Sequence, residues 1–163
     1  MAGSGDEATT IGQTISFALN AHVRRRRLGV VTGADGVYKF PGAETGLLPD
    51  VGFYSAERRS LIADRSKPIP FAPDLAVEVA SPSPSQDAGA MAAKARHYLA
   101  GGTRLVWVVW PERREVDVWR RDNPDRPAAT LRAVVALDGE DIVAGFSYPV
   151  ADVFADPLGW PQG

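Results

Sequence analysis

The segment 73–80 constrains the fold more than any other part of the chain. It reads Pro-Asp-Leu-Ala-Val-Glu-Val-Ala, and Glu78 is the one charged residue inside its apolar run. Both faces of this run are otherwise apolar, which is typical of a strand that is buried on both faces. Burying an unpaired carboxylate costs several kcal/mol. Glu78 must therefore be protonated, paired with a cation or bound to a metal.

Composition limits the functions that could explain this carboxylate. The chain has 163 residues, a formal net charge of -2, 45% hydrophobic residues and 23% charged residues. These values are ordinary for one soluble globular domain. The charge excludes a protein that coats nucleic acid through bulk positive charge, although it allows a nucleic-acid enzyme with a local basic patch.

The chain has no cysteine, which narrows the chemistry further. Disulfides, thiolate metal sites and a cysteine nucleophile are all excluded. The two histidines, His22 and His97, are too few for a His-rich zinc site, and we assign no role to either. Any metal would be held mainly by oxygen, which favours Mg²⁺ or Mn²⁺.

The ends and the apolar runs predict a cytoplasmic protein. Residues 1–10 are small and polar and do not resemble a signal peptide. The longest apolar runs, such as 105–110, are too short to span a bilayer. We expect a disordered leader over residues 1–8 and a single domain over residues 9–163.

Periodicity and turn residues predict an alternation of helices and strands. One helix starts at Thr9 or Thr10 and is ended by Gly29, and a second covers 86–100, with Ser85 as its N-cap and Gly101-Gly102 as its stop. The expected strands are 30–31, 37–40, 49–54, 73–80, 105–110, 115–120 and, with a weaker pattern, 131–137.

Three of these elements carry side chains that could form one site. Asp50 opens a strand, Glu78 lies within the next strong strand, and Lys94 lies on the helix that follows. If the two strands are neighbours, the carboxylates meet at one end of the sheet and the helix folds back over that end. Two carboxylates and a lysine are what metal-assisted phosphodiester hydrolysis needs.

The sequence resembles the Uma2-type restriction endonuclease family, part of the PD-(D/E)XK nuclease superfamily. The resemblance runs from about residue 9 to the C-terminus and is most specific between 73 and 111. It rests on the runs 49–51, 72–83 and 107–111 together with Asp87, Lys94, Tyr98 and Gly101.

The resemblance implies an α/β (α+β) fold with a restriction-endonuclease-like core, a mixed β-sheet flanked by helices. It implies a metal-dependent endonuclease that hydrolyses DNA, with Mg²⁺ or Mn²⁺ as cofactor. The catalytic residues would be Asp50, Glu78 and Lys94. Asp50 and Glu78 would bind the metal, with the Val79 carbonyl as third ligand. Ala80 stands where the Glu-X-Lys motif of the superfamily has its lysine. In this family the lysine is on the next helix, where it matches Lys94.

Two further residues match recurring positions of the family without a clear role. Tyr98 and Asp87 are expected to support the site, although Asp87 in the first helical turn is also explained by the helix dipole. Family members usually begin with an extra segment that supplies another acidic residue, and this chain starts after that point. We therefore expect either a misassigned start or a short form with weaker metal binding.

A run of arginines suggests contact with DNA. These residues are Arg24, Arg25, Arg26 and Arg27. Arginines in the last turn of a helix also suit its dipole, and four consecutive residues cannot all face one duplex. We expect DNA as partner and no membrane, and leave open whether the protein is a homodimer. The alternative function is a catalytically silent scaffold that binds a protein or nucleic-acid partner.

Overall fold

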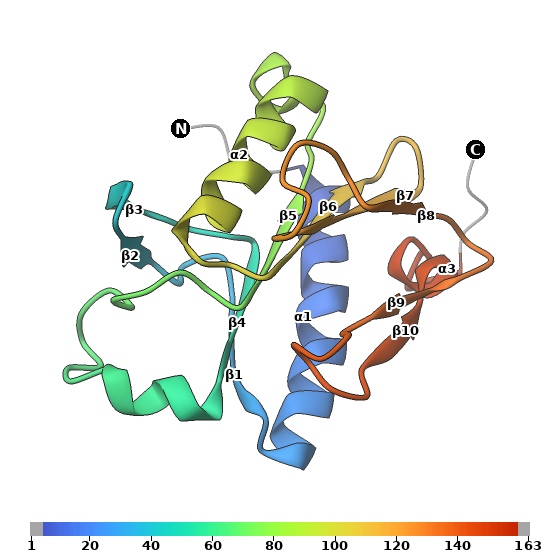
Figure 1. Cartoon of the computed structure of the whole chain (residues 1–163). Coiled ribbons are helices and arrows are strands. Elements are labelled where there is room, and N and C mark those ends of the chain that lie inside the picture. The colour runs from blue at the N-terminus through green and yellow to red at the C-terminus, as the bar shows by residue number, and fades with distance from the viewer. Residues whose placement is uncertain (1–4, 160–163) are drawn as a thin grey trace.

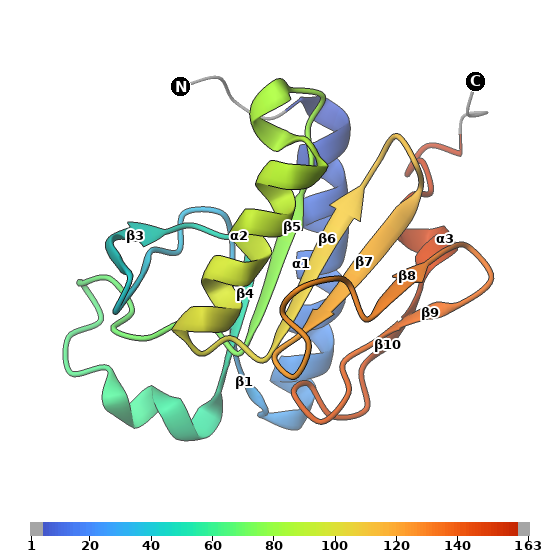
Figure 2. The ribbon, with the colours of Figure 1, turned by 45° about the horizontal axis from the view of Figure 1, so that its top comes forward.

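Two helices pack on opposite faces of a six-stranded sheet in a computed structural model of the chain (Figures 1 and 2). The structure describes residues 5–159. The helices are α1 (Asp6–Arg26), α2 (Ala88–Gly101) and the short α3 (Val150–Val153). The expected fold class, a mixed sheet flanked by helices, is confirmed.

The sheet has the order β1-β4-β5-β6-β7-β8. Its central pair, β5 and β6, is parallel, and every other neighbouring pair is antiparallel. The parallel pair is possible because α2 forms the crossover between its two strands. The strands of this sheet are β1 (Gly29–Thr32), β4 (Val51–Ser55), β5 (Leu75–Val79), β6 (Leu105–Trp110), β7 (Glu115–Arg120) and β8 (Ala129–Leu131).

Four short strands lie outside the main sheet. They form two hairpin-like pairs, β2 (Tyr38–Phe40) with β3 (Ala43–Leu47), and β9 (Ala136–Asp138) with β10 (Ser147–Pro149). Two 3-10 segments, Ala56–Leu61 and Pro84–Gln86, complete the fold.

Strand β5 separates two cores, as its apolar pattern predicts. Its five residues are all buried. Leu75, Val77 and Val79 belong to the core that α1 covers, whereas Ala76 belongs to the core that α2 covers. Because side chains alternate along a strand, Glu78 points to the α2 face. The lone charge of the run is therefore enclosed between the sheet and α2.

The predicted helix boundaries were wrong by a few residues. Helix α1 begins at Asp6, so the predicted leader is helical over residues 6–8, and residues 1–4 lie outside the described residues. It ends with Arg27 in the left-handed conformation, ahead of Gly29. The N-cap of α2 is Asp87 rather than Ser85, and its C-cap is Gly102. The Asp87 carboxylate accepts the N–H of Ala90 at 2.8 Å, which is how a cap satisfies a free donor.

The predicted strand 131–137 was also wrong. Its two ends belong to β8 and β9, which lie in different sheets, and residues 132–135 turn between them. Val134 is 95% exposed, so its apolar side chain does not mark a buried strand. Among residues 5–159, no helix has the length and hydropathy that a membrane crossing requires.

Candidate active site

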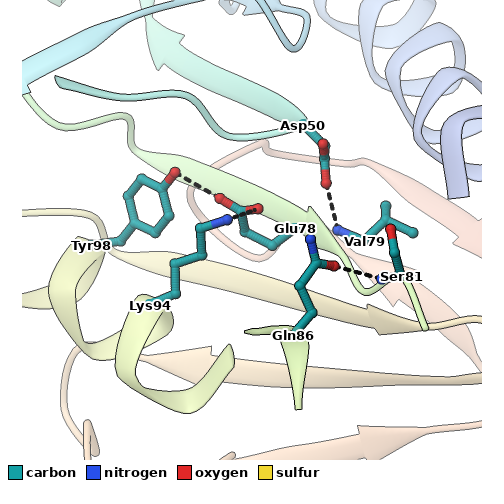
Figure 3. A network of polar contacts seen from close by, with 7 residues as sticks. All are labelled: Asp50, Glu78, Val79, Ser81, Gln86, Lys94 and Tyr98. Carbon is teal, nitrogen blue, oxygen red and sulfur yellow. Dashed lines mark hydrogen bonds and ion pairs between the residues drawn. The ribbon is translucent and has the colours of Figure 1, made fainter. Parts of the chain in front are cut away.

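Antiparallel pairing brings Asp50 and Glu78 to the same end of the sheet. Asp50 immediately precedes β4, and Glu78 is the next-to-last residue of β5, with Val51 opposite Val77. The backbone N–H of Val79 donates to Asp50 Oδ2 at 2.7 Å (Figure 3). The predicted meeting of the two strands is confirmed, and the Asp50 carboxylate is fixed by the neighbouring strand.

Helix α2 contributes two donors to the Glu78 carboxylate (Figure 3). Lys94 Nζ lies 2.8 Å from Oε2, and the Tyr98 hydroxyl donates to Oε1 at 2.8 Å. The two donors are four residues apart, so they lie on one face of the helix, one turn from each other. Each carboxylate oxygen of Glu78 thus has one protein donor, and the orientation of the carboxylate is fixed.

Burial decides the protonation behaviour of this cluster. Glu78 is only 3% exposed, and burial raises its pKa to about 7 even though the charge of Lys94 opposes the shift. Burial also raises the pKa of Asp50, against the Val79 N–H and Lys94. The pKa of the Tyr98 hydroxyl is raised by burial and by Glu78, which keeps the hydroxyl protonated as a donor.

The hydroxyl of Tyr98 should matter to stability when Glu78 is charged. We expect Tyr98→Phe to lower the free energy of unfolding at pH 8 by about 1.5–3 kcal/mol, the usual contribution of a hydrogen bond to a charged group. Phe fills the same space, so the loss isolates the hydrogen bond. Denaturant unfolding of both proteins at pH 8 measures it, and equal stability would contradict the assigned contact.

The donor set fits a hard divalent cation. Mg²⁺ usually keeps several waters and takes one or two carboxylates. Asp50 and Glu78 supply two, and each Glu78 oxygen retains a lone pair beside its bound donor. Within residues 5–159, no cluster holds three or more His, Cys, Asp or Glu side chains arranged for a metal. Asp50 and Glu78 are therefore not joined by a third such side chain in this part of the chain.

The backbone ligand predicted from the sequence is the Val79 carbonyl. If the register of Val51 with Val77 continues, Pro49 stands opposite Val79. Proline has no N–H, so it offers no ladder donor to that carbonyl. The Val79 N–H already faces Asp50, and in an antiparallel pair the carbonyl of the same residue faces the same neighbour. Metal binding by Val79 stays a prediction that this backbone arrangement supports.

The other predicted residues lie apart from the carboxylates or have another partner. Asp87 caps α2, as described above. The arginine run lies at the C-terminal end of α1, which is remote from the site (Figure 2). Arg27 lines a surface cavity together with Ser55, the last residue of β4. Asp50, in contrast, immediately precedes the first residue of β4. Contact of these arginines with DNA stays a prediction. The length of the sheet separates them from the two carboxylates.

One supporting contact was not predicted. The side chain of Gln86 accepts the backbone N–H of Ser81 at 2.6 Å, which closes the turn that follows β5 (Figure 3). Ser81 and Gln86 flank the Ser-Pro repeat, and Ser83 caps the 3-10 turn between them. The proline-rich spacing indicates a turn, but the sequence does not indicate which polar side chain completes it.

Comparisons with known proteins give the family and the fold. Residues 1–151 match the model of the Uma2 family, described as "Putative restriction endonuclease". A crystal structure described as a putative nuclease of the DUF820 family, from Anabaena variabilis, matches with a TM-score of 0.73 and 18% identity. The match covers 94% of this chain and 83% of that chain, and at this identity it shows the fold. No curated protein matches the chain.

Proposed function

The chain belongs to the Uma2 family of restriction-endonuclease-type proteins, and we propose that it is a metal-dependent endonuclease that hydrolyses DNA phosphodiester bonds. The observation that carries the proposal is the buried Glu78 carboxylate, held by Lys94 and Tyr98 next to Asp50 at one end of the sheet. An ion pair with a purely structural role would need neither the Asp50 carboxylate nor its hydrogen bond from the Val79 N–H.

Each residue has a distinct role in this proposal. Asp50 and Glu78 hold the cation, with the Val79 carbonyl as a further ligand. A bound divalent cation supplies Lewis acidity at the phosphate. Lys94, whose side chain is 38% exposed, has donors to spare beyond its bond to Glu78 and positions the attacking water. Tyr98 holds the Glu78 carboxylate, and its burial keeps water away from that side of the site.

Metal binding tests the carboxylate pair directly. We expect Asp50→Asn to weaken Mg²⁺ or Mn²⁺ binding by at least about tenfold, because ligand charge sets affinity for hard cations. Asn retains an oxygen that can accept the Val79 N–H, so the local fold should persist. Calorimetric titration measures the affinity, and relaxation of supercoiled plasmid with Mg²⁺ or EDTA measures the activity.

The matched control is Asp122→Asn, which removes an exposed carboxylate that follows β7, at the other end of the sheet. This variant should bind metal and cleave plasmid like the wild type. Equal metal affinity in Asp50→Asn and the wild type would rule out the proposed ligand set.

The alternative is a catalytically silent scaffold that binds a protein or nucleic-acid partner. The observation in its favour is that, in the described part of the chain, the acidic set has two carboxylates rather than three. The same titration separates the two functions, because a silent scaffold should show no metal binding that depends on Asp50 and Glu78.

A further inference from the structure

Three arginines line one cavity on the α2 face of the sheet. The cavity has a volume of about 260 Å³ and lies between α2 and strands β6 and β7. Its guanidinium groups come from three separate segments: Arg96 from α2, Arg113 from the turn between β6 and β7, and Arg126 from the loop between β7 and β8. The tertiary structure therefore gathers positive charge that no run in the sequence indicates.

Arg113 is held in place by a stack and a hydrogen-bonded chain. Its guanidinium carbon lies 4.3 Å from the centre of the Trp110 ring. The Trp110 indole N–H donates to Asp117 Oδ2 at 2.9 Å, and the Thr130 hydroxyl donates to Asp117 Oδ1 at 2.7 Å. Stacking uses the face of a guanidinium group and leaves the donors at its edge available. The Trp110 ring thus orients the Arg113 guanidinium group, whose N–H donors remain available at its edge.

The three arginines outnumber the two carboxylates of this cavity. Among residues 5–159, none of the three guanidinium groups takes part in an ion pair. Two carboxylates also line the cavity, and one of them, Asp117, already accepts from Trp110 and Thr130. The other is the exposed Asp125. An anion entering the cavity would meet three guanidinium groups with open donors.

The arginine cavity and the Glu78 side chain lie on the same face of the sheet, and the strand register relates their positions. Val108 is opposite Glu78 in the parallel pair, so Trp110 lies two residues further along the same direction, which is about 7 Å along a strand. A smaller cavity of about 180 Å³ is lined by Ala80 and Ser81, just after β5, and also by Trp110 and Arg113. The two cavities share these last two residues.

We propose that this arginine cavity binds phosphate groups of the nucleic-acid strand that leads to Glu78. The inference rests on the proposed function and adds the place where the backbone is held. The Arg113 fork suits a phosphate, because guanidinium groups bind phosphate oxygens through two parallel hydrogen bonds. Arg96 and Arg126 add positive charge to the same cavity, and the Trp110 ring supports the Arg113 guanidinium group.

Binding of a fluorescein-labelled DNA duplex in metal-free buffer tests the proposal. By fluorescence anisotropy, Arg113→Gln should weaken binding about tenfold. The slope of log affinity against log salt should fall in magnitude by about one, which corresponds to one lost phosphate contact. Arg113→Lys retains the charge but lacks the fork, so we expect most of the loss to remain. The triple variant Arg96→Gln, Arg113→Gln, Arg126→Gln should lower the slope by about two to three contacts.

The control is Arg121→Gln, which removes one exposed arginine that follows β7, whereas Arg113 precedes this strand. It should bind DNA with wild-type affinity and slope. Equal affinities of Arg113→Gln and the wild type, or an equal loss in Arg121→Gln, would overturn the proposal. Because the assay needs no cleavage, these outcomes are separate from failure of the nuclease function, which would appear as no metal-dependent cleavage of plasmid by the wild type.

Discussion

Glu78→Gln is expected to abolish metal-dependent cleavage while making the folded protein more stable at pH 8. The first effect follows because Gln removes the charged ligand from the cation site. Loss of an outer-shell partner alone costs about 10–100-fold in metal proteins, so loss of the ligand should lower the cleavage rate by at least about 100-fold. Plasmid relaxation with Mg²⁺ measures this, and cleavage at the wild-type rate would refute the site.

The second effect follows from the raised pKa of Glu78. Burial raises this pKa from 4.5 to about 7, so the folded state holds the proton more tightly than the unfolded state. The contribution of Glu78 to stability is therefore fully present below pH 4.5 and is lost as the pH rises through about 7. Gln never carries the charge and avoids the loss.

A thermal melt at two pH values checks the stability effect. At pH 8, Glu78→Gln should be more stable than the wild type by about 1–3 kcal/mol, after allowing for the lost ion pair with Lys94. Each kcal/mol corresponds to about 2–4 °C in melting temperature. The difference should shrink at pH 5, where the wild-type side chain is protonated. A lower melting temperature at pH 8 would show that the ion pair outweighs the burial cost.

Lys94→Ala is expected to lower the cleavage rate by about 10²–10³-fold and to move the acid limb of the pH profile upward. The rate falls because a positioned cation near the reacting phosphate is lost. The limb moves because, within the cluster, Lys94 is the largest influence that lowers the pKa of Glu78. Its removal raises that pKa, and cleavage then requires a higher pH to deprotonate the ligand.

The conservative variant separates charge from position. Lys94→Arg retains a positive charge near Glu78, so the acid limb should stay close to that of the wild type. The planar guanidinium group differs from an ammonium group in shape and donors, so the rate should recover only in part. Cleavage rates between pH 5 and pH 9 give both readouts. A limb unchanged in Lys94→Ala would contradict the coupling between the two side chains.

The fold was predictable where burial and local pattern agree. The bounds of β6 and β7 match the predicted 105–110 and 115–120, because an apolar strand and a strand of alternating residues flank a clear turn. The prediction failed at 131–137, where apolar residues lie in an exposed turn. It also failed at the start of α2, where both Ser85 and Asp87 are good caps and only the tertiary structure selects one.

The amino-acid pattern alone establishes that Glu78 needs a partner, because a carboxylate inside a strand buried on both faces cannot remain charged and alone. It also determined the candidate partners, since Asp50 and Lys94 stand on the preceding strand and the following helix. The three-dimensional fold was needed to show that antiparallel pairing brings Asp50 to Val79, and that the Tyr98 hydroxyl donates to the second oxygen of Glu78. It alone gathered Arg96, Arg113 and Arg126 around one cavity, because contacts between distant segments depend on sheet order and helix placement rather than on local spacing.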